Sequence, residues 1–110
     1  MAYDEDLADR IRLTLSGTPF VEKKMFGGLA FLINGNMSVS ASGQDGLLVR
    51  VDPAATEALL GEPGAEEFEM GNRGPMQGWL RVTPDVLRDD DTLAAWVDRG
   101  VSYARSLPPK

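Results

Sequence analysis

The sequence predicts an α+β domain, an antiparallel sheet of a meander plus two further strands, with N-terminal, short middle and C-terminal helices packed on it. Three observations indicate this class. Apolar residues recur at helical spacing near both ends, they alternate with polar residues between these ends, and an Asn-Gly pair separates two extended segments. Strands are grouped and do not alternate singly with helices, which excludes a doubly wound parallel sheet. With 110 residues, 43% of them hydrophobic, we expect one domain over residues 1–110.

The first helix is predicted from Asp4 to Ser16. Acidic residues occupy its first turn, where the helix dipole favours negative charge, and Gly17 with Pro19 ends it. Leu13 lies outside the apolar stripe of this helix. The stripe consists of residues three or four positions apart, Leu7, Ala8, Ile11 and Leu15. We therefore expect this stripe to face the core.

Residues 21–51 predict an antiparallel meander. Gly27 and Gly28 interrupt its first extended segment, and we interpret them as a bend, because they lack the spacing of phosphate-binding glycines. Asn34-Gly35 predicts a tight type I′ turn, which requires positive φ at both central positions. The next strand is predicted to bury one face and expose the other, because apolar Met37, Val39 and Ala41 alternate with Ser38, Ser40 and Ser42. A turn at 43–46 and a third meander strand at 47–51 follow.

After the meander, Asp52-Pro53 predicts the cap and first turn of a short helix that continues to Leu60. Two more strands are expected over residues 66–70 and 79–82. A glycine-rich loop at 71–78 joins them.

The chain is predicted to close with a helical turn and a long helix. Thr83-Pro84 starts the turn, and the long helix extends from about Asp91, its expected N-cap, to Leu107. Its apolar residues follow helical spacing: Leu93, Trp96, Val97, Gly100, Val101, Ala104 and Leu107.

The composition excludes several kinds of chemistry. With no Cys and no His, the chain has no thiolate nucleophile, no disulfide, no Cys/His zinc site and no Ser-His-Asp relay. Asp89-Asp90-Asp91 could offer oxygen ligands to Mg²⁺, but acids at a helix start are more simply explained as a cap and a solvated turn. We therefore expect no catalytic residue, no metal and no cofactor.

Charge and hydropathy suggest where the protein works. The net charge of −6 opposes binding to polyanions, so we do not expect a direct nucleic-acid ligand. Residues 1–10 are acidic and polar, unlike a secretory signal, and no apolar run approaches the roughly 20 residues of a membrane span. These features predict a cytoplasmic protein without membrane contact.

Several segments resemble the N-terminal domain of the TfoX/Sxy family. The most specific are Glu22-Lys23-Lys24-Met25-Phe26-Gly27-Gly28-Leu29-Ala30-Phe31 and, after it, Asn34-Gly35-Asn36-Met37. Residues 46–51, 78–82 and 93–97 agree as well, and the similarity spans roughly Tyr3 to Pro108. It implies an α+β fold of the secretion-chaperone-like type, without enzymatic activity or cofactor.

The resemblance also implies a regulatory role. The best-known family members regulate natural competence in bacteria together with the cyclic-AMP receptor protein at promoters, and they have a second, C-terminal domain. The present sequence ends where such a domain would begin, so it resembles a stand-alone N-terminal module. We accordingly expect a small regulatory or adaptor module that acts by protein–protein contact, its partner being a DNA-binding transcription factor or a second copy of the chain.

A protein contact is also indicated by the strand at residues 30–33. Its residues are all apolar and do not alternate with polar ones, so both of its faces should be covered. The cover could come from another chain, including a homodimer partner, or from the sheet folding over itself. The candidate interaction surface comprises basic, apolar and glycine residues of the predicted sheet: Lys23, Lys24, Met25, Phe26, Gly27, Gly28, Arg50, Arg73, Trp79 and Arg81. Two alternatives remain open, a direct nucleic-acid-binding regulator that uses these cations and aromatic rings, and a small-ligand-binding or enzymatic domain that uses carboxylates.

Overall fold

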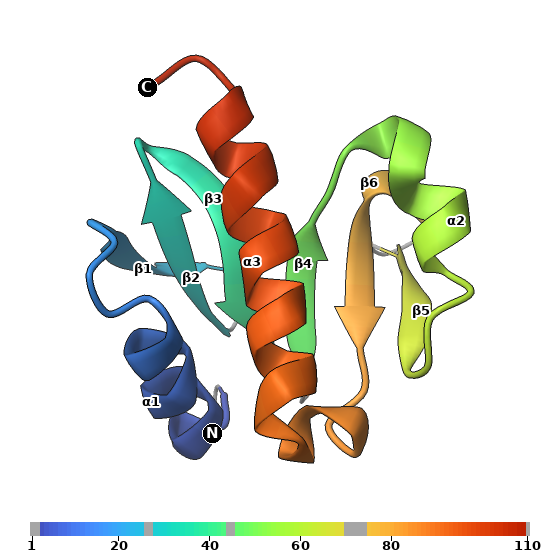
Figure 1. Ribbon diagram of the computed structural model, residues 1–110, viewed down its shortest axis with the longest axis horizontal. Helices are drawn as coiled ribbons and strands as arrows, with labels where there is room; N and C mark the ends of the chain where they lie inside the picture. Colours follow the sequence, from blue (N-terminus) through green and yellow to red (C-terminus); the bar gives the residue numbers. More distant parts are fainter. Residues whose placement is uncertain (1–2, 26–27, 44–45, 70–74, 110) are drawn as a thin grey trace.

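The computed structural model describes residues 3–25, 28–43, 46–69 and 75–109 (Figure 1). Its six strands form one antiparallel sheet in the order β1-β2-β3-β4-β6-β5. The elements in chain order are α1 (Glu5–Thr14), β1 (Val21–Met25), β2 (Gly28–Ile33), β3 (Asn36–Ala41), β4 (Leu47–Arg50), η1 (Pro53–Ala55), α2 (Thr56–Leu59), β5 (Ala65–Glu69), β6 (Pro75–Val82), η3 (Val86–Arg88) and α3 (Asp90–Ser106). The predicted α+β class is confirmed.

Helices α1 and α3 cover one face of the sheet, and α3 crosses its middle in front of β3 and β4 (Figure 1). The core between them includes the buried side chains of Ile11, Phe31, Val49 and Trp96. Burial of this much apolar surface is the main stabilising contribution in a domain of this size. Among the described residues, no helix is both long enough and apolar enough to cross a bilayer.

The local signals at α1 and at the β2–β3 turn act as predicted. The carboxylate of Asp4 caps α1 by accepting hydrogen bonds from the backbone N–H groups of Asp6 and Leu7. Leu13 is 75% exposed, as its place outside the apolar stripe predicts. Asn34 and Gly35 have φ values of 54° and 82°, the positive values that the tight hairpin needs.

The predicted alternation along β3 is wrong at its serines. Ser38 and Ser40 are buried, and their hydroxyl groups donate to the carbonyl oxygens of Phe31 (2.8 Å) and Leu29 (3.1 Å). The pairing register of β2 and β3 shifts after Phe31, so that the extra residue forms a bulge in β3. Met37 therefore packs in a different cluster from Val39, on the opposite side of the sheet.

The glycine pair does not bend a single strand. Strands β1 and β2 are antiparallel, and Met25 pairs with Gly28, so the chain reverses between them. A Cβ atom on Gly28 would lie 2.3 Å from the carbonyl oxygen of Ala41, so this glycine permits close backbone approach. Gly27 lies outside the described residues.

Two predicted boundaries also differ. Strand β6 begins at Pro75, inside the expected loop, and residues 70–74 of that loop lie outside the described part of the chain. The N-cap of α3 is Asp89, two residues before the expected Asp91. The carboxylate of Asp89 accepts a hydrogen bond from the hydroxyl of Thr92 (2.8 Å), which fixes it at the helix start.

Candidate interaction surface

The open sheet face is defined here as the face opposite α1 and α3. Alternate residues of each strand point to opposite faces, so Leu47 and Val49 pack under the helices while Leu48 points to the open face. A second apolar cluster covers this face, formed by Ala30, Leu32, Met37, Leu48, Phe68 and Trp79. On this face, Ala30 is buried by its neighbours in the same chain, whereas Leu32 is only partly buried.

Arg50, Trp79 and Tyr103 form an aromatic–cation group at this cluster. The guanidinium carbon of Arg50 lies 5.6 Å from the ring centre of Trp79 and 5.7 Å from that of Tyr103. The ring of Trp79 also lies 6.5 Å from that of Phe68, at an angle of 50°. A cation over a partly exposed ring contributes about 0.5–1 kcal/mol. These contacts hold the Arg50 side chain against the sheet.

Arg81 lies next to this group. It is the cross-strand partner of Leu48 on one side and of Glu66 on the other, so all three side chains point to the open sheet face. Its Nη1 is 3.4 Å from Oε1 of Glu66. An ion pair this long and this exposed contributes little to stability.

The structure brings together three of the predicted surface residues, Arg50, Trp79 and Arg81, and places the others differently. Lys23 pairs with Ala30 and so shares the open sheet face, but on the edge strand β1. Lys24 pairs with Leu29, which puts it on the helix side. The side chain of Met25 and all of Phe26, Gly27 and Arg73 lie outside what the structure describes. Gly28 is buried.

Phe68 on the open sheet face and Tyr103 on α3, which contacts Arg50 of this face, were both missed in the sequence. Phe68 lies among glutamates of a predicted strand, and Tyr103 lies on the last helix outside its apolar spacing. Only the β4–β6 and β5–β6 pairings and the crossing of α3 reveal that these rings lie near Arg50. The signal in the sequence that could have pointed to them is that each is an aromatic residue among polar neighbours.

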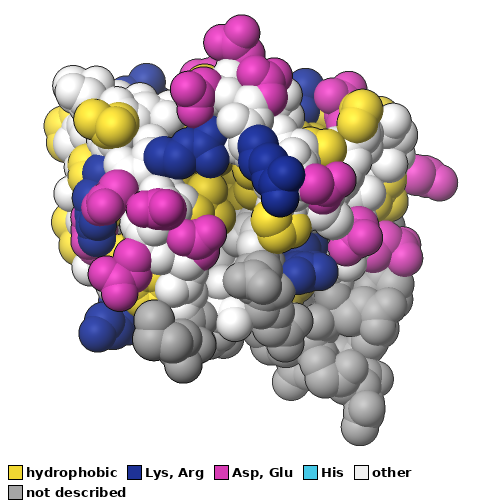
Figure 2. All heavy atoms as spheres, turned by 90° about the horizontal axis from the view of Figure 1, so that it is seen from below, with side chains coloured by type: hydrophobic (Ala, Val, Ile, Leu, Met, Phe, Trp, Pro, Cys, Tyr) yellow, Lys and Arg dark blue, Asp and Glu magenta, His cyan; other side chains and the backbone are white. Residues whose placement is uncertain are grey.

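Acidic residues gather instead at the end of the molecule where α1 and α3 begin (Figure 2). A hollow of about 460 Å³ lies there, lined by the acids Asp4, Asp6 and Asp9 together with Leu7, Leu87, Arg10 and Arg88. Arg10 donates to Asp90 at 2.7 Å. Within the described ranges, no three His, Cys, Asp or Glu side chains are placed to hold a metal ion together.

Two carboxylates have clearly shifted pKa values. The hydrogen bond from Arg12 lowers the pKa of Glu22, and the hydrogen bond from the Thr83 hydroxyl lowers that of Asp85. Both shifts favour the ionised form, whereas a general acid at neutral pH needs a raised pKa.

A six-stranded antiparallel sheet with helices on one face places the chain in a class of small α+β domains. The TfoX N-terminal domain family matches residues 13–104, from the end of α1 almost to the end of α3. The chain therefore belongs to the TfoX N-terminal domain family. No curated protein matches the chain.

Proposed function

We propose that this chain is a non-enzymatic regulatory module of the bacterial cytoplasm that binds an acidic protein surface through its open sheet face. The TfoX N-terminal domain family suggests a function related to competence, and a transcription factor is the partner that this relation favours. The observation that supports binding is the group of Arg50, Trp79 and Arg81 on a sheet face that no helix covers. Trp, Tyr and Arg are the residues most enriched at the energetic centres of protein interfaces.

The charge of this face supports an acidic partner. Its described side chains include three bases, Lys23, Arg50 and Arg81, and the acid Glu66, whereas the whole chain has a net charge of −6. Opposite charges on two surfaces raise the association rate and exclude partners of the wrong sign. An acidic surface therefore complements the open sheet face better than it complements the rest of the protein.

A nucleic acid and a second copy of the chain fit this face less well than an acidic protein does. The ring of Trp79 already contacts Arg50 and Phe68, which leaves less of it for stacking on a nucleic-acid base. A permanent homodimer needs a broad apolar contact. In the described part of the chain the exposed large hydrophobic side chains are Leu13 on α1 and Val21 on the edge strand β1, so the open sheet face offers only one of them. We therefore propose a partner protein that binds reversibly.

The proposal is tested by reversing charge on each side of the molecule. The double variant Arg50→Glu/Arg81→Glu changes the open sheet face, and Arg88→Glu/Arg105→Glu makes the same change in net charge at exposed positions elsewhere. Tagged proteins are used to capture partners from the native cell, and the captured protein is then purified and titrated by calorimetry. We expect affinity to fall at least about tenfold for the first variant, to fall with added salt for the wild type, and to stay unchanged for the second variant.

Three results would contradict the proposal. They are equal affinity of both double variants, loss of the captured partner on nuclease treatment, and a dimer of the purified chain in sedimentation. Thermal unfolding of each variant confirms that it is folded before its affinity is compared. A reporter of competence gene expression in cells that produce only the first variant tests the regulatory role.

A further inference from the structure

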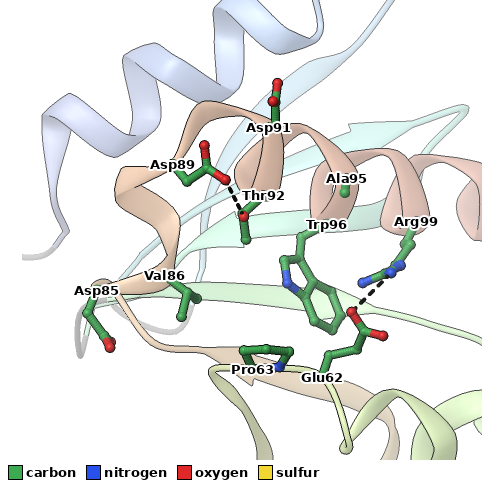
Figure 3. A pocket seen from close by; sticks show the side chains of 10 residues that line it. All are labelled: Glu62, Pro63, Asp85, Val86, Asp89, Asp91, Thr92, Ala95, Trp96 and Arg99. Carbon is green, nitrogen blue, oxygen red and sulfur yellow. Dashed lines mark hydrogen bonds and ion pairs between the residues drawn. The ribbon is translucent and has the colours of Figure 1, made fainter.

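A pocket of about 470 Å³ lies on the helix side, away from the open sheet face (Figure 3). It is formed by the start of α3, the turn that follows β6 and the turn that precedes β5. Pro63 and Val86 contribute apolar surface, and Trp96 lines it from α3. Pockets that bind small molecules have volumes of about 300–1,000 Å³.

The indole N–H of Trp96 lacks a hydrogen-bond acceptor among the described residues. Trp96 is only 2% exposed, and the guanidinium carbon of Arg99 lies 4.5 Å from its ring centre. Figure 3 shows the indole nitrogen at the edge of the ring turned from Arg99 toward Val86. A buried indole N–H ordinarily has a partner. Here it is available to an acceptor that enters the pocket.

Four carboxylates and only one basic side chain, Arg99, line the same pocket. Glu62 is paired with Arg99 at 3.4 Å, whereas Asp85, Asp89 and Asp91 form no salt bridge with the part of the chain that is described. The hydrogen bond from Thr83 keeps the pKa of Asp85 below its ordinary value, so this group is ionised at neutral pH. The pocket therefore favours a cation.

We propose that this pocket binds a lysine or arginine residue within a basic peptide segment of a partner protein. Such a residue meets all three features, because its main-chain carbonyl accepts from the indole of Trp96, its methylenes pack on Pro63 and Val86, and its charge is complementary to the exposed aspartates around the pocket. A phosphate or nucleotide is repelled by the carboxylates. A metal ion or a polyamine offers no acceptor for the indole.

This site does not depend on the surface proposed above. Trp96 belongs to the core under the helices, whereas Trp79 belongs to the cluster on the open sheet face. The two sites also require partner surfaces of opposite charge. Each can therefore be tested without the other.

The two tryptophans of the chain supply the measurement. A ¹H–¹⁵N spectrum contains one indole signal from each, and Trp79→Phe identifies that of Trp96. The probe is acetyl-Gly-Arg-Gly-amide, and its control is the same peptide with citrulline, which has nearly the same shape but no charge. We expect a saturable shift of the Trp96 signal with the arginine peptide and at least about fivefold weaker binding of the citrulline peptide, because the attraction to the exposed aspartates of the pocket requires a positive charge.

Single variants then assign the binding to the aspartates. We expect Asp85→Asn and Asp91→Asn each to weaken the arginine peptide about threefold or more. Asp98→Asn, which removes an exposed acid of the same helix that does not line the pocket, should leave the affinity unchanged. An unmoved Trp96 signal, equal binding of the two peptides, or unchanged affinity in both pocket variants would overturn the proposal, and so would a shift of the Trp79 signal alone.

Discussion

At position 100, the lack of a side chain determines how closely α3 approaches the sheet. A Cβ atom there would lie 2.5 Å from the carbonyl oxygen of Ser38 and 2.8 Å from Cγ1 of Val39. The first of these atoms belongs to the backbone of a central strand, which cannot move without disturbing its pairing with β2 and β4. Close packing of α3 on β3 therefore requires glycine.

We predict that Gly100→Ala lowers the free energy of unfolding by about 1–3 kcal/mol, the usual cost of overpacking a core. This loss remains after the gain of up to about 1 kcal/mol that alanine gives over glycine inside a helix. Urea unfolding followed by circular dichroism measures it. Gly61→Ala is the control, because its Cβ would lie 3.4 Å from the nearest atom and its φ is not positive; an equal effect at the two positions would refute the explanation.

A pair of residues on α1 separates core packing from helix propensity. Ile11 is fully buried, whereas Leu13, two positions along the same helix, is 75% exposed. We predict that Ile11→Ala costs about 2–5 kcal/mol in unfolding free energy, because it leaves a cavity between α1 and the sheet. Leu13→Ala should change it by less than about 0.5 kcal/mol. Unfolding curves of the two variants, recorded side by side, measure these changes. Similar losses of unfolding free energy would mean that burial of the apolar stripe does not stabilise α1 on the sheet.

Helix α1 is joined to β1 by an ion pair. Arg12 donates to both carboxylate oxygens of Glu22, at 2.5 and 2.9 Å. This contact lowers the pKa of Glu22 from its ordinary 4.5, so the carboxylate stabilises the fold above pH 4.5 and loses this effect as the pH falls through the lower pKa of the folded state.

The variant Glu22→Gln should be less stable than the wild type by about 0.5 kcal/mol at pH 7, since both partners are about one third exposed. We predict that the difference disappears as the pH is lowered below 4.5 and shrinks in high salt. Unfolding curves at several pH values measure it. Glu57→Gln, at an exposed position, is the control; a difference that grows on acidification would contradict the assignment.

At the scale of elements, the sequence predicted features that depend on neighbouring residues, but it did not predict a feature that depends on contacts with a distant strand. The Asp4 cap and the Asn34-Gly35 turn depend on neighbouring residues in the chain, and both were predicted. The bulge in β3 depends on hydrogen bonds from buried serine hydroxyls to β2, and Ser38 carries no local mark of them. Alternation alone therefore predicted Ser38 and Ser40 to be exposed, and it placed Met37, which is buried as predicted, on the same side of the sheet as Val39.

Across the whole molecule, helices cover only one face of the sheet, and charge is distributed unevenly. Acidic side chains gather at the end where α1 and α3 begin (Figure 2), while Arg50 and Arg81 lie on the open sheet face. The sequence predicted the basic and aromatic residue types of the candidate surface. It could not predict which of them meet, because the contacts of Arg50 with Trp79 and Tyr103 require strand pairing and helix packing between segments far apart in the chain.

Helix α3 follows all six strands in the chain, and this order has a consequence for synthesis in the cell. A ribosome completes all six strands before it releases residues 90–106, and until then only α1 shields the inner side of the sheet. The unfinished polypeptide thus exposes apolar side chains of the sheet, to which chaperones and other nascent chains can bind. A product that stops within these seventeen residues would keep the inner side of the sheet exposed, and we expect it to be degraded faster than the complete chain.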